Sequence, residues 1–388
     1  MWIKRTLTQK IKKAQKSRPA LLLSGARQTG KSSLLKFMFP EAEYITLDRV
    51  LIAQNAEDNP ASFLSQFKST VILDEIQYAP SLFRELKIII DDERQKYGKW
   101  ILTGSQKLSL MKNISESLAG RIGIIQLYTL SAEELRSHGF SGASLADAIW
   151  AGGYPELWAN TEIDREMFYS DYIQTYLERD LKALINVTDL RTFQRFITVC
   201  ASRAGQILNY AGMANDLGVS AVTIKSWLNA LEASGIVALL PPYYANIGKR
   251  LIKSPMLYFC DTGLLAHLLN IDSSSAYEQS IHKGALWENF TFCELIKTCD
   301  AIPGRNLFFY RDQNGVEIDF LFEKNKSLYL IEAKASERVN QQKLNFNKVA
   351  KLFKKHNVKC ILSCRAIEDH PINLSDYTIC NPLHHNLL

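Results

Sequence analysis

Residues 25–32 combine glycine, lysine and serine at the spacing that phosphate binding requires. The segment GARQTGKS fits the pattern G-x-x-x-x-G-K-[ST], follows an apolar run and precedes a helical pattern. In such a loop, glycines let backbone amides surround phosphate oxygens, a lysine reaches the β- and γ-phosphates, and a hydroxyl ligates Mg²⁺. The expected nucleotide-binding residues are Gly25, Ala26, Arg27, Gln28, Thr29, Gly30, Lys31, Ser32 and Ser33.

An acidic pair follows a second apolar run, in VILDE at 71–75. This strand would deliver Asp74 to the Mg²⁺ shell beside Ser32, and Glu75 just beyond it can polarise the attacking water. Taken alone, two acids after a strand are ordinarily an exposed pair. Their distance from the phosphate loop favours the catalytic interpretation.

Further polar residues are placed to take part in hydrolysis. A run at 100–102 ends in TGSQ, where Thr103 or Ser105 could touch the γ-phosphate or the attacking water. An acidic base on an inserted third strand, with a polar sensor on the next, is a feature of ATPases. Arg121 in SLAGRI has two open interpretations. It is either an arginine finger that reaches a neighbouring subunit of a homo-oligomer, or a structural salt bridge.

A second set of reactive residues lies in VEIDFLFEKNKSLYLIEAK at 316–334. Alternating apolar and acidic residues predict a half-buried strand, followed by a hairpin with NK as a two-residue loop. This register sets Asp319 opposite Glu332 and Glu317 opposite Lys334. Facing carboxylates repel, so a cation must compensate them, and a shared Mg²⁺ is one solution. The alternative is that these acids are solvated surface charges.

The apolar pattern predicts an α/β framework for these residues. Strand-like runs (ALLLSG, EYITLD, TVILDE, KWILTGS and RIGIIQL) alternate with helical stretches, which is the pattern of a parallel sheet. We expect four parts: a P-loop ATPase domain at 1–143, a helical connector at 144–202, a helix-turn-helix unit at 203–270 and a domain of mixed helix and strands at 271–388.

The third part has a helix-turn-helix pattern with Ser220 as the N-cap of its second helix. The expected buried stripe of that helix is Ile224, Trp227, Leu228 and Leu231. Two apolar runs then flank a wing-like segment with the cations Lys249, Arg250 and Lys253. The exposed face of the helix carries one lysine and an opposing glutamate, which is weak for reading DNA bases or clamping phosphates. DNA contact and a domain-connecting role both remain open.

Composition describes a globular protein of several domains. Of its 388 residues, 47% are hydrophobic and 22% charged, and the formal net charge is +6. This charge is compatible with a polyanionic partner, and the basic first twenty residues fit either an amphipathic helix or a nucleic-acid arm. No apolar run approaches a membrane span, and the seven scattered cysteines argue against disulfides. We therefore expect a cytoplasmic protein without a membrane partner.

The ordered motifs GARQTGKSSLL, VILDEIQ, ILTGSQ, SLAGR, GGYPE and YLERDL resemble the prokaryotic AAA+-type ATPases whose C-terminal half carries domain of unknown function 4143. The resemblance covers essentially the whole chain. It implies ATP binding with hydrolysis, a winged helix in the third part and a restriction-endonuclease-like α/β domain in the fourth.

The fourth part resembles PD-(D/E)xK nucleases at individual positions. Asp319, Glu332 and Lys334 match the three motif residues, and Glu288 in GALWENF matches an acid on a preceding helix. The resemblance implies a second Mg²⁺ or Mn²⁺ site held by the three acids, with Lys334 as a catalytic residue. An accessory polar residue would be Gln341 or Gln342.

These features together predict a Mg²⁺-dependent ATPase whose nucleotide state controls a nuclease-like module, with DNA as a candidate partner. The alternative is an ATP-dependent switch or partner-binding protein in which the nuclease-like module is catalytically silent.

Overall fold

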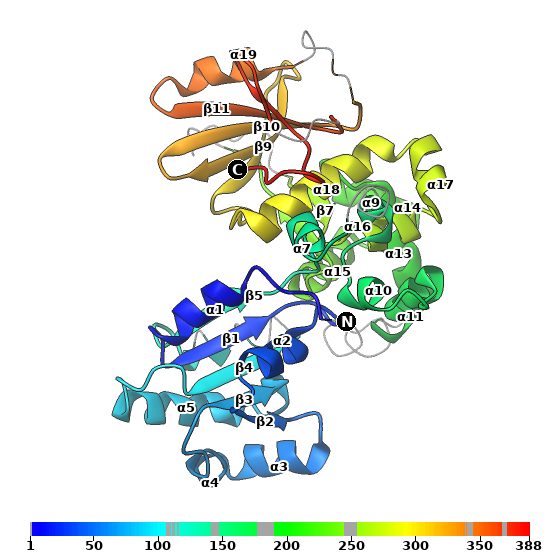
Figure 1. Cartoon of the computed structure of the whole chain (residues 1–388). Coiled ribbons are helices and arrows are strands. Elements are labelled where there is room, and N and C mark those ends of the chain that lie inside the picture. Colours follow the sequence, from blue (N-terminus) through cyan, green and yellow to red (C-terminus); the bar gives the residue numbers. More distant parts are fainter. Residues whose placement is uncertain are drawn as a thin grey trace. The chain divides into compact units, whose positions relative to one another are not determined.

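The computed structural model describes residues 2–105, 110, 113–114, 116–140, 147–176, 190–243, 254–337, 339, 344–366 and 371–388. The chain forms two compact units (Figure 1). The N-terminal unit comprises Arg5–Tyr128 with Ala233–Gly235, and the C-terminal unit comprises Met1–Lys4, Thr129–Glu232 and Ile236–Leu388. The four-part division that the sequence suggests stays a prediction.

A five-stranded parallel sheet forms the N-terminal unit, in the order β2-β3-β4-β1-β5. Its strands are β1 (Ala20–Ser24), β2 (Glu43–Thr46), β3 (Val71–Asp74), β4 (Trp100–Gly104) and β5 (Ile122–Gln126). Every residue of β1, β3 and β4 is buried, which explains their continuous apolar runs. The parallel sheet predicted from the alternating pattern is confirmed, and β4 lies between β1 and β3.

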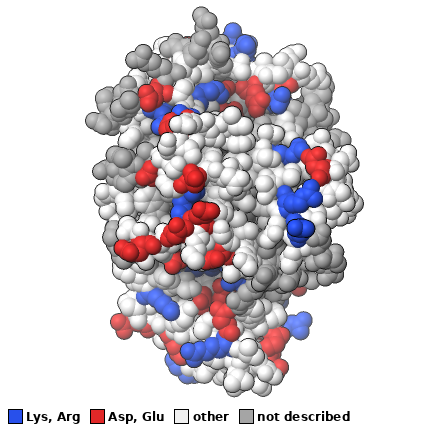
Figure 2. All heavy atoms as spheres, turned by 90° about the vertical axis from the view of Figure 1, so that its right-hand side faces the viewer, with Lys and Arg blue, Asp and Glu red and all other residues white. Residues whose placement is uncertain are grey.

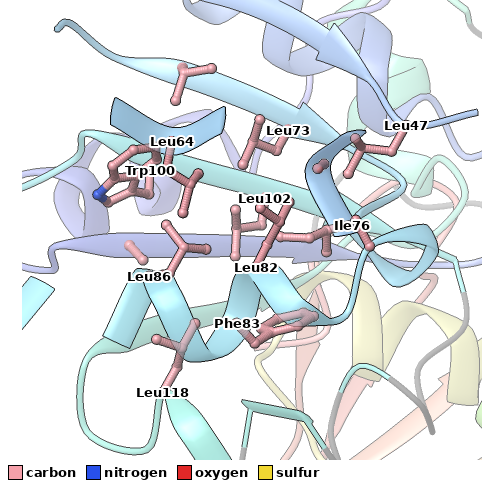
Figure 3. Close-up of a cluster of buried hydrophobic side chains, with 14 of the residues drawn as sticks. Leu47, Leu64, Leu73, Ile76, Leu82, Phe83, Leu86, Trp100, Leu102 and Leu118 are labelled. Atoms are coloured by element: carbon pink, nitrogen blue, oxygen red, sulfur yellow. The ribbon is translucent and has the colours of Figure 1, made fainter. Parts of the chain in front are cut away.

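Helices cover the sheet and supply its core. They are α1 (Thr8–Gln15), α2 (Lys31–Met38), α3 (Val50–Asp58), α4 (Pro60–Ser65), the 3₁₀ turn η1 (Ile76–Tyr78) and α5 (Ser81–Asp92). Figure 3 shows Leu82, Phe83 and Leu86 of α5 beside the sheet residue Leu102, and all four are buried. Because the strands are parallel, their carboxyl ends meet at one edge, where the phosphate-loop pattern and both acids lie.

Helices dominate the first half of the C-terminal unit. They are α7 (Ala132–Ser137), α9 (Ala148–Ala151), α10 (Pro155–Ala159), α11 (Arg165–Tyr176), α13 (Leu190–Ser202), α14 (Tyr210–Leu217), α15 (Ala221–Ala233), α16 (Thr262–Leu268) and α17 (Ser274–Gln279). A two-stranded antiparallel sheet of β6 (Val237–Leu240) and β7 (Met256–Phe259) follows α15 in the chain.

The helix-turn-helix prediction is confirmed in α14 and α15. Gly218 ends α14 in a left-handed conformation, and the Ser220 hydroxyl accepts a hydrogen bond from the Thr223 amide at 3.0 Å. The predicted stripe is buried: Ile224, Trp227, Leu228 and Leu231. The cations of the expected wing, Lys249, Arg250 and Lys253, lie outside the described residues, as does most of the YLERDL motif.

A six-stranded mixed sheet forms the rest of the unit, in the order β12-β13-β11-β10-β9-β8. Its strands are β8 (Leu307–Arg311), β9 (Glu317–Lys324), β10 (Ser327–Lys334), β11 (Asn357–Cys364), β12 (Ile372–Asn373) and β13 (Thr378–Cys380), and the flanking helices are α18 (Lys283–Thr298) and α19 (Phe346–Ala350). The hairpin register is confirmed, since Ser327 pairs with Lys324 around a loop in which Asn325 and Lys326 both have positive φ.

The cysteines, the surface charges and the lengths of the helices can be compared with the predictions from composition. Within the described residues, the seven cysteines form no disulfide. Basic and acidic side chains occur side by side on the face drawn in Figure 2. Within the described residues, none of the helices has the length and apolar character needed to cross a membrane.

Candidate functional site

The phosphate-loop pattern forms the turn between β1 and α2. A side chain at Gly25 would place its Cβ 2.2 Å from the Leu127 carbonyl oxygen, and Gly30 has a left-handed φ of 88°. The Lys31 ammonium is buried in the turn and donates to the carbonyl oxygens of Gly25 at 3.0 Å and Ala26 at 2.9 Å. The loop backbone therefore curls around the lysine that the pattern predicts to meet a phosphate.

Arg5 supports the same loop from a distant part of the sequence. It is only 5% exposed, and its guanidinium donates to the carbonyl oxygens of Thr29 at 2.9 Å and Tyr128 at 2.6 Å. Sequence reasoning placed Arg5 among the basic residues of the first segment and gave it no role. No sequence pattern distinguishes Arg5 from the exposed Lys4 beside it, because the two residues differ in burial, which only the structure shows.

Asp74 is the centre of a group of hydroxyls. Ser32 Oγ donates to both of its carboxylate oxygens, at 3.0 and 2.9 Å, and the hydroxyls of Tyr44 and Thr103 also bond to it. Burial, followed by the hydrogen bond to Asp74, raises the pKa of Tyr44 above its ordinary value, so this hydroxyl stays protonated and donates. Lys36 lies over the Tyr44 ring, 3.7 Å from its centroid.

Glu75 is held by a different set of neighbours. Its backbone adopts a left-handed conformation with φ 57°, and its amide lies 3.3 Å from Thr103 Oγ1. The carboxylate oxygen Oε2 accepts from Ser105 Oγ at 3.2 Å and from the Gln77 side-chain amide. Thr103 and Ser105, expected near a γ-phosphate, thus bond directly to the two acids. Gln77 and Tyr44 were not predicted as site residues.

Arg121 forms an ion pair within its own unit. Its Nε and terminal nitrogen both donate to the Asp91 carboxylate at 2.7 Å. Hydrogen bonding by Arg121 lowers the pKa of Asp91. This arrangement matches the salt-bridge interpretation of Arg121.

The acids of the C-terminal hairpin lie around a lysine. Asp319 and Glu332 are 8% and 4% exposed, and Lys334 Nζ lies 3.4 Å from Asp319 Oδ2 and 2.7 Å from Glu332 Oε2. Asp319 Oδ2 also accepts the Ala333 amide at 2.7 Å. The cation that the facing acids require is therefore supplied by Lys334. Glu317 pairs with a neighbouring-strand arginine, Arg311, at 3.5 Å.

Burial dominates the electrostatics of this cluster. Burial, and then the charge of Asp319, raises the pKa of Glu332 to about 7 and the pKa of Glu288 well above its usual range. Burial lowers the pKa of Lys334, but Asp319 and Glu332 outweigh it and raise that pKa overall. Glu332 Oε1 is buried and has no hydrogen-bond partner in the described part of the chain.

Glu288 lies on α18 and is positioned by residues of other segments. Tyr258 of β7, which is fully buried and stacked on Phe292, donates to Glu288 Oε1 at 2.5 Å. A side chain at Gly205 would come within 3.2 Å of that oxygen. Within the described ranges, no three His, Cys, Asp or Glu side chains are grouped so that they could hold a metal. Gln341 and Gln342 lie outside those ranges.

Family models and relatives agree on the chain's affiliation. An AAA domain model matches residues 17–136, a domain of unknown function (DUF8612) matches 142–275, and a second one (DUF4143) matches 283–383. Uncharacterized protein Rv2008c of Mycobacterium tuberculosis and Uncharacterized protein Mb2031c of Mycobacterium bovis are each 33% identical over 338 residues, which cover 85% of this chain and 74% of each relative.

Solved structures with similar folds are more distant. The Walker-type ATPase PABY2304 of Pyrococcus abyssi is 17% identical, with a TM-score of 0.43, and the match covers 69% of this chain and 96% of that one. The RuvB Holliday junction branch migration motor of Thermotoga maritima is also 17% identical, with a TM-score of 0.31 and coverage of 61% and 89%. The mycobacterial relatives and the AAA and DUF4143 matches show that the chain belongs to the family of prokaryotic AAA-type ATPases with a C-terminal DUF4143 domain.

Proposed function

We propose that the N-terminal unit binds ATP with Mg²⁺ and hydrolyses it, and that its nucleotide state controls the C-terminal unit. One observation carries the proposal: Ser32 Oγ, at the start of α2, lies within 3.0 Å of both oxygens of Asp74. A phosphate loop and the acid of another strand therefore converge as ATP hydrolysis requires. The AAA domain match supports the same activity.

The side chains around Asp74 suit a hard cation. Mg²⁺ prefers oxygen ligands, and Ser32 and Asp74 offer a hydroxyl and a carboxylate at one point. Among the described residues, the neighbours bonded to Asp74 are neutral hydroxyls, so its charge is not cancelled by a cationic side chain. Ser32 and Asp74 would hold the ion, which would neutralise phosphate charge when bound.

The remaining residues have separate tasks. Backbone amides of residues 25–33, with the Lys31 ammonium, would hold the phosphates and neutralise their charge. Glu75 would take a proton from the attacking water, since its Oε2 is held by Ser105 and Gln77. Thr103 joins both acids, because it bonds to the Asp74 carboxylate and lies 3.3 Å from the Glu75 amide.

Two substitutions test the assignment. Lys31→Ala should weaken ATP binding by about 100-fold or more, because the phosphates lose their buried cation. Glu75→Gln should bind ATP normally but lose turnover, because an amide cannot accept the proton. Lys87→Ala, on the exposed face of α5, is the matched control. Hydrolysis that persists in both Lys31→Ala and Glu75→Gln would contradict the proposal.

A second candidate function concerns the C-terminal acids. Among the described residues, the buried Glu332 Oε1 has no hydrogen-bond partner, and it lies beside the Asp319–Lys334 pair, which favours a site that meets a further ligand. The three predicted metal ligands do not form a three-carboxylate group in the described residues, and Lys334 already bridges two of them. We therefore derive no metal-dependent step for this site.

Incubation with plasmid, single-stranded DNA and RNA, each with Mg²⁺ or Mn²⁺, distinguishes the two interpretations of the C-terminal unit. Cleavage that disappears in both Asp319→Ala and Lys334→Ala supports a nuclease. The absence of cleavage on every substrate, with no metal binding by calorimetry, supports a nucleotide-dependent switch. A gel-shift with the same nucleic acids tests DNA contact by α15 through Lys225→Ala.

An arginine finger would need a neighbouring copy of the chain. The pairing of Arg121 with Asp91 gives the finger no support in a single chain. Native mass measurement with ATP and Mg²⁺ tests the remaining route. An oligomer that forms only with ATP, and that loses turnover when Arg121 is replaced by alanine, would support an arginine finger. A protein that stays monomeric and retains turnover would contradict it.

A further inference from the structure

We propose that Gln77 is a positioning residue for Glu75, and that Gly104 is a glycine because a larger residue would occupy the space that the Gln77 amide needs. This inference rests on the proposed function of Glu75 as the base. Neither Gln77 nor Gly104 was given a role in the predicted nucleotide site.

The Gln77 amide has a defined orientation beside Glu75. Gln77 Nε2 donates to Glu75 Oε2, and this direction is required because an amide carbonyl oxygen cannot donate to a carboxylate. The other amide atom, Gln77 Oε1, is buried and has no hydrogen-bond partner among the described residues. A buried unpaired carbonyl oxygen costs stability, so the amide is not placed for the benefit of folding alone.

Gly104 borders the space that the amide occupies. A Cβ at Gly104 would lie 2.5 Å from Gln77 Oε1, well inside contact distance. It would also lie 2.5 Å from Leu110 Cδ1. Any larger residue at the end of β4 must therefore displace the Gln77 side chain, the Leu110 side chain or both. Gly104 thus leaves room for Gln77 beside the acid.

The two carboxylate oxygens of Glu75 differ in their hydrogen bonds. Oε2 accepts from both Gln77 and Ser105, whereas within the described part of the chain Oε1 bonds to nothing. Two donors on one oxygen fix the carboxylate plane, and the other oxygen stays available to accept a proton from water. Glu75 directly follows β3 and has a left-handed backbone with φ 57°. Gln77, two residues later on η1, then sets where the carboxylate points.

The main experiment compares steady-state ATP hydrolysis by wild type, Gln77→Met and Gln54→Met. Methionine keeps the length of the side chain but removes the donor, and Gln54 is an exposed glutamine of α3 that serves as the control. Gln77→Met should lose about tenfold to hundredfold in kcat, because a small misplacement of a base slows proton transfer. KM and the affinity for a non-hydrolysable ATP analogue should change less than about twofold, which a general loss of structure would not allow.

A double-mutant cycle tests the role of Gly104 independently. Gly104→Ala should lower kcat in the wild-type background but have little further effect in the Gln77→Met background, because the residue it displaces no longer donates. If the two effects instead multiply, Gly104 acts through Leu110 and the spatial argument is wrong. If Gln77→Met is poorly folded, Gly104→Ala alone tests the inference, since it retains the glutamine: a loss of kcat with an unchanged KM supports the positioning role, and a wild-type kcat overturns it.

Failure of the inference can be told apart from failure of the proposed function. Near wild-type kcat in both Gln77→Met and Gly104→Ala, with Glu75→Gln inactive, would overturn the positioning role and leave Glu75 as the base. Wild-type turnover by Glu75→Gln would overturn the proposed function itself.

Discussion

Each unit contains a pair of acids, Asp74 with Glu75 and Asp319 with Glu332, but their carboxylates are stabilised in different ways. In the N-terminal unit, Asp74 is surrounded by the hydroxyls of Ser32, Tyr44 and Thr103. In the C-terminal unit, Asp319 and Glu332 share the ammonium of Lys334. Neutral donors stabilise an anion without cancelling its charge, whereas an ammonium cancels one charge within the site.

This difference bears on what each site can bind. A carboxylate that keeps its charge attracts a divalent cation arriving with a nucleotide, because the attraction between them is not offset beforehand. At the hairpin, a metal would have to compete with Lys334 for the same oxygens. This difference supports the proposed nucleotide chemistry at Asp74, whereas Asp319 and Glu332 are joined by an ion bridge to Lys334.

Replacement of matched aspartates should produce the largest contrast. Asp74→Asn should reduce Mg²⁺-dependent ATP hydrolysis by about 100-fold or more, because the neutral side chain cannot hold the ion. Asp319→Asn should leave the rate within about twofold of wild type, since it lies in the other unit. Steady-state phosphate release measures both. Equal losses in the two variants would break the comparison.

Removal of the internal cation should mainly affect stability. Lys334→Met leaves two buried acids without their partner and should cost about 2 kcal/mol of unfolding free energy, a value reduced because the Lys334 side chain is 37% exposed. Denaturant unfolding measures this loss. The exposed Lys354→Met is the control and should cost less than about 0.5 kcal/mol. A Lys334→Met variant as stable as wild type would show that the ion bridge does not hold the hairpin.

The raised pKa of Glu332 predicts a pH dependence. Burial, and then Asp319, raises that pKa to about 7 in the folded protein, above its ordinary value of 4.5. Between these values the folded protein binds more protons than the unfolded one, so this group makes the unfolding free energy fall as pH rises. Glu332→Gln should make the unfolding free energy fall less steeply between pH 5 and pH 8. Replacement of the exposed Glu337 by glutamine should leave this pH dependence unchanged. Parallel profiles for all three proteins would contradict the assignment.

The smallest effects should come from two tyrosine hydroxyls. Tyr44→Phe removes one donor from Asp74 and should raise the Mg²⁺ concentration for half-maximal hydrolysis about threefold. Tyr258→Phe removes the donor of Glu288 and should leave that concentration unchanged. A Mg²⁺ titration of the ATPase rate measures this concentration. An equal rise in both variants would contradict the difference between the two sites.

Local patterns predicted the parts of both sites that depend on neighbours in sequence. The phosphate loop follows from glycine, lysine and serine at fixed offsets, and the hairpin register follows from a loop in which Asn325 and Lys326 take positive φ. The facing acids Asp319 and Glu332 predicted a compensating cation, and a shared Mg²⁺ there stays a prediction. The contact of Lys334 with both carboxylates depends on a side-chain conformation that spacing cannot specify.

Residues that reach a site from another segment of the chain were beyond this kind of prediction. Tyr44 reaches Asp74 because β2 pairs with β3, and Arg5, which precedes α1, reaches Thr29 of the phosphate loop. Tyr258 meets Glu288 across 30 positions of sequence. Each is an ordinary tyrosine or arginine in its local segment, so only the packing of the folded chain distinguishes it.

Counting bound Mn²⁺ by electron paramagnetic resonance, with and without a non-hydrolysable ATP analogue, tests the central claim most directly. The wild type should gain about one Mn²⁺ per chain when the analogue is added, and Asp74→Asn should gain none. An equal gain of nucleotide-dependent Mn²⁺ in wild type and Asp74→Asn would contradict the account.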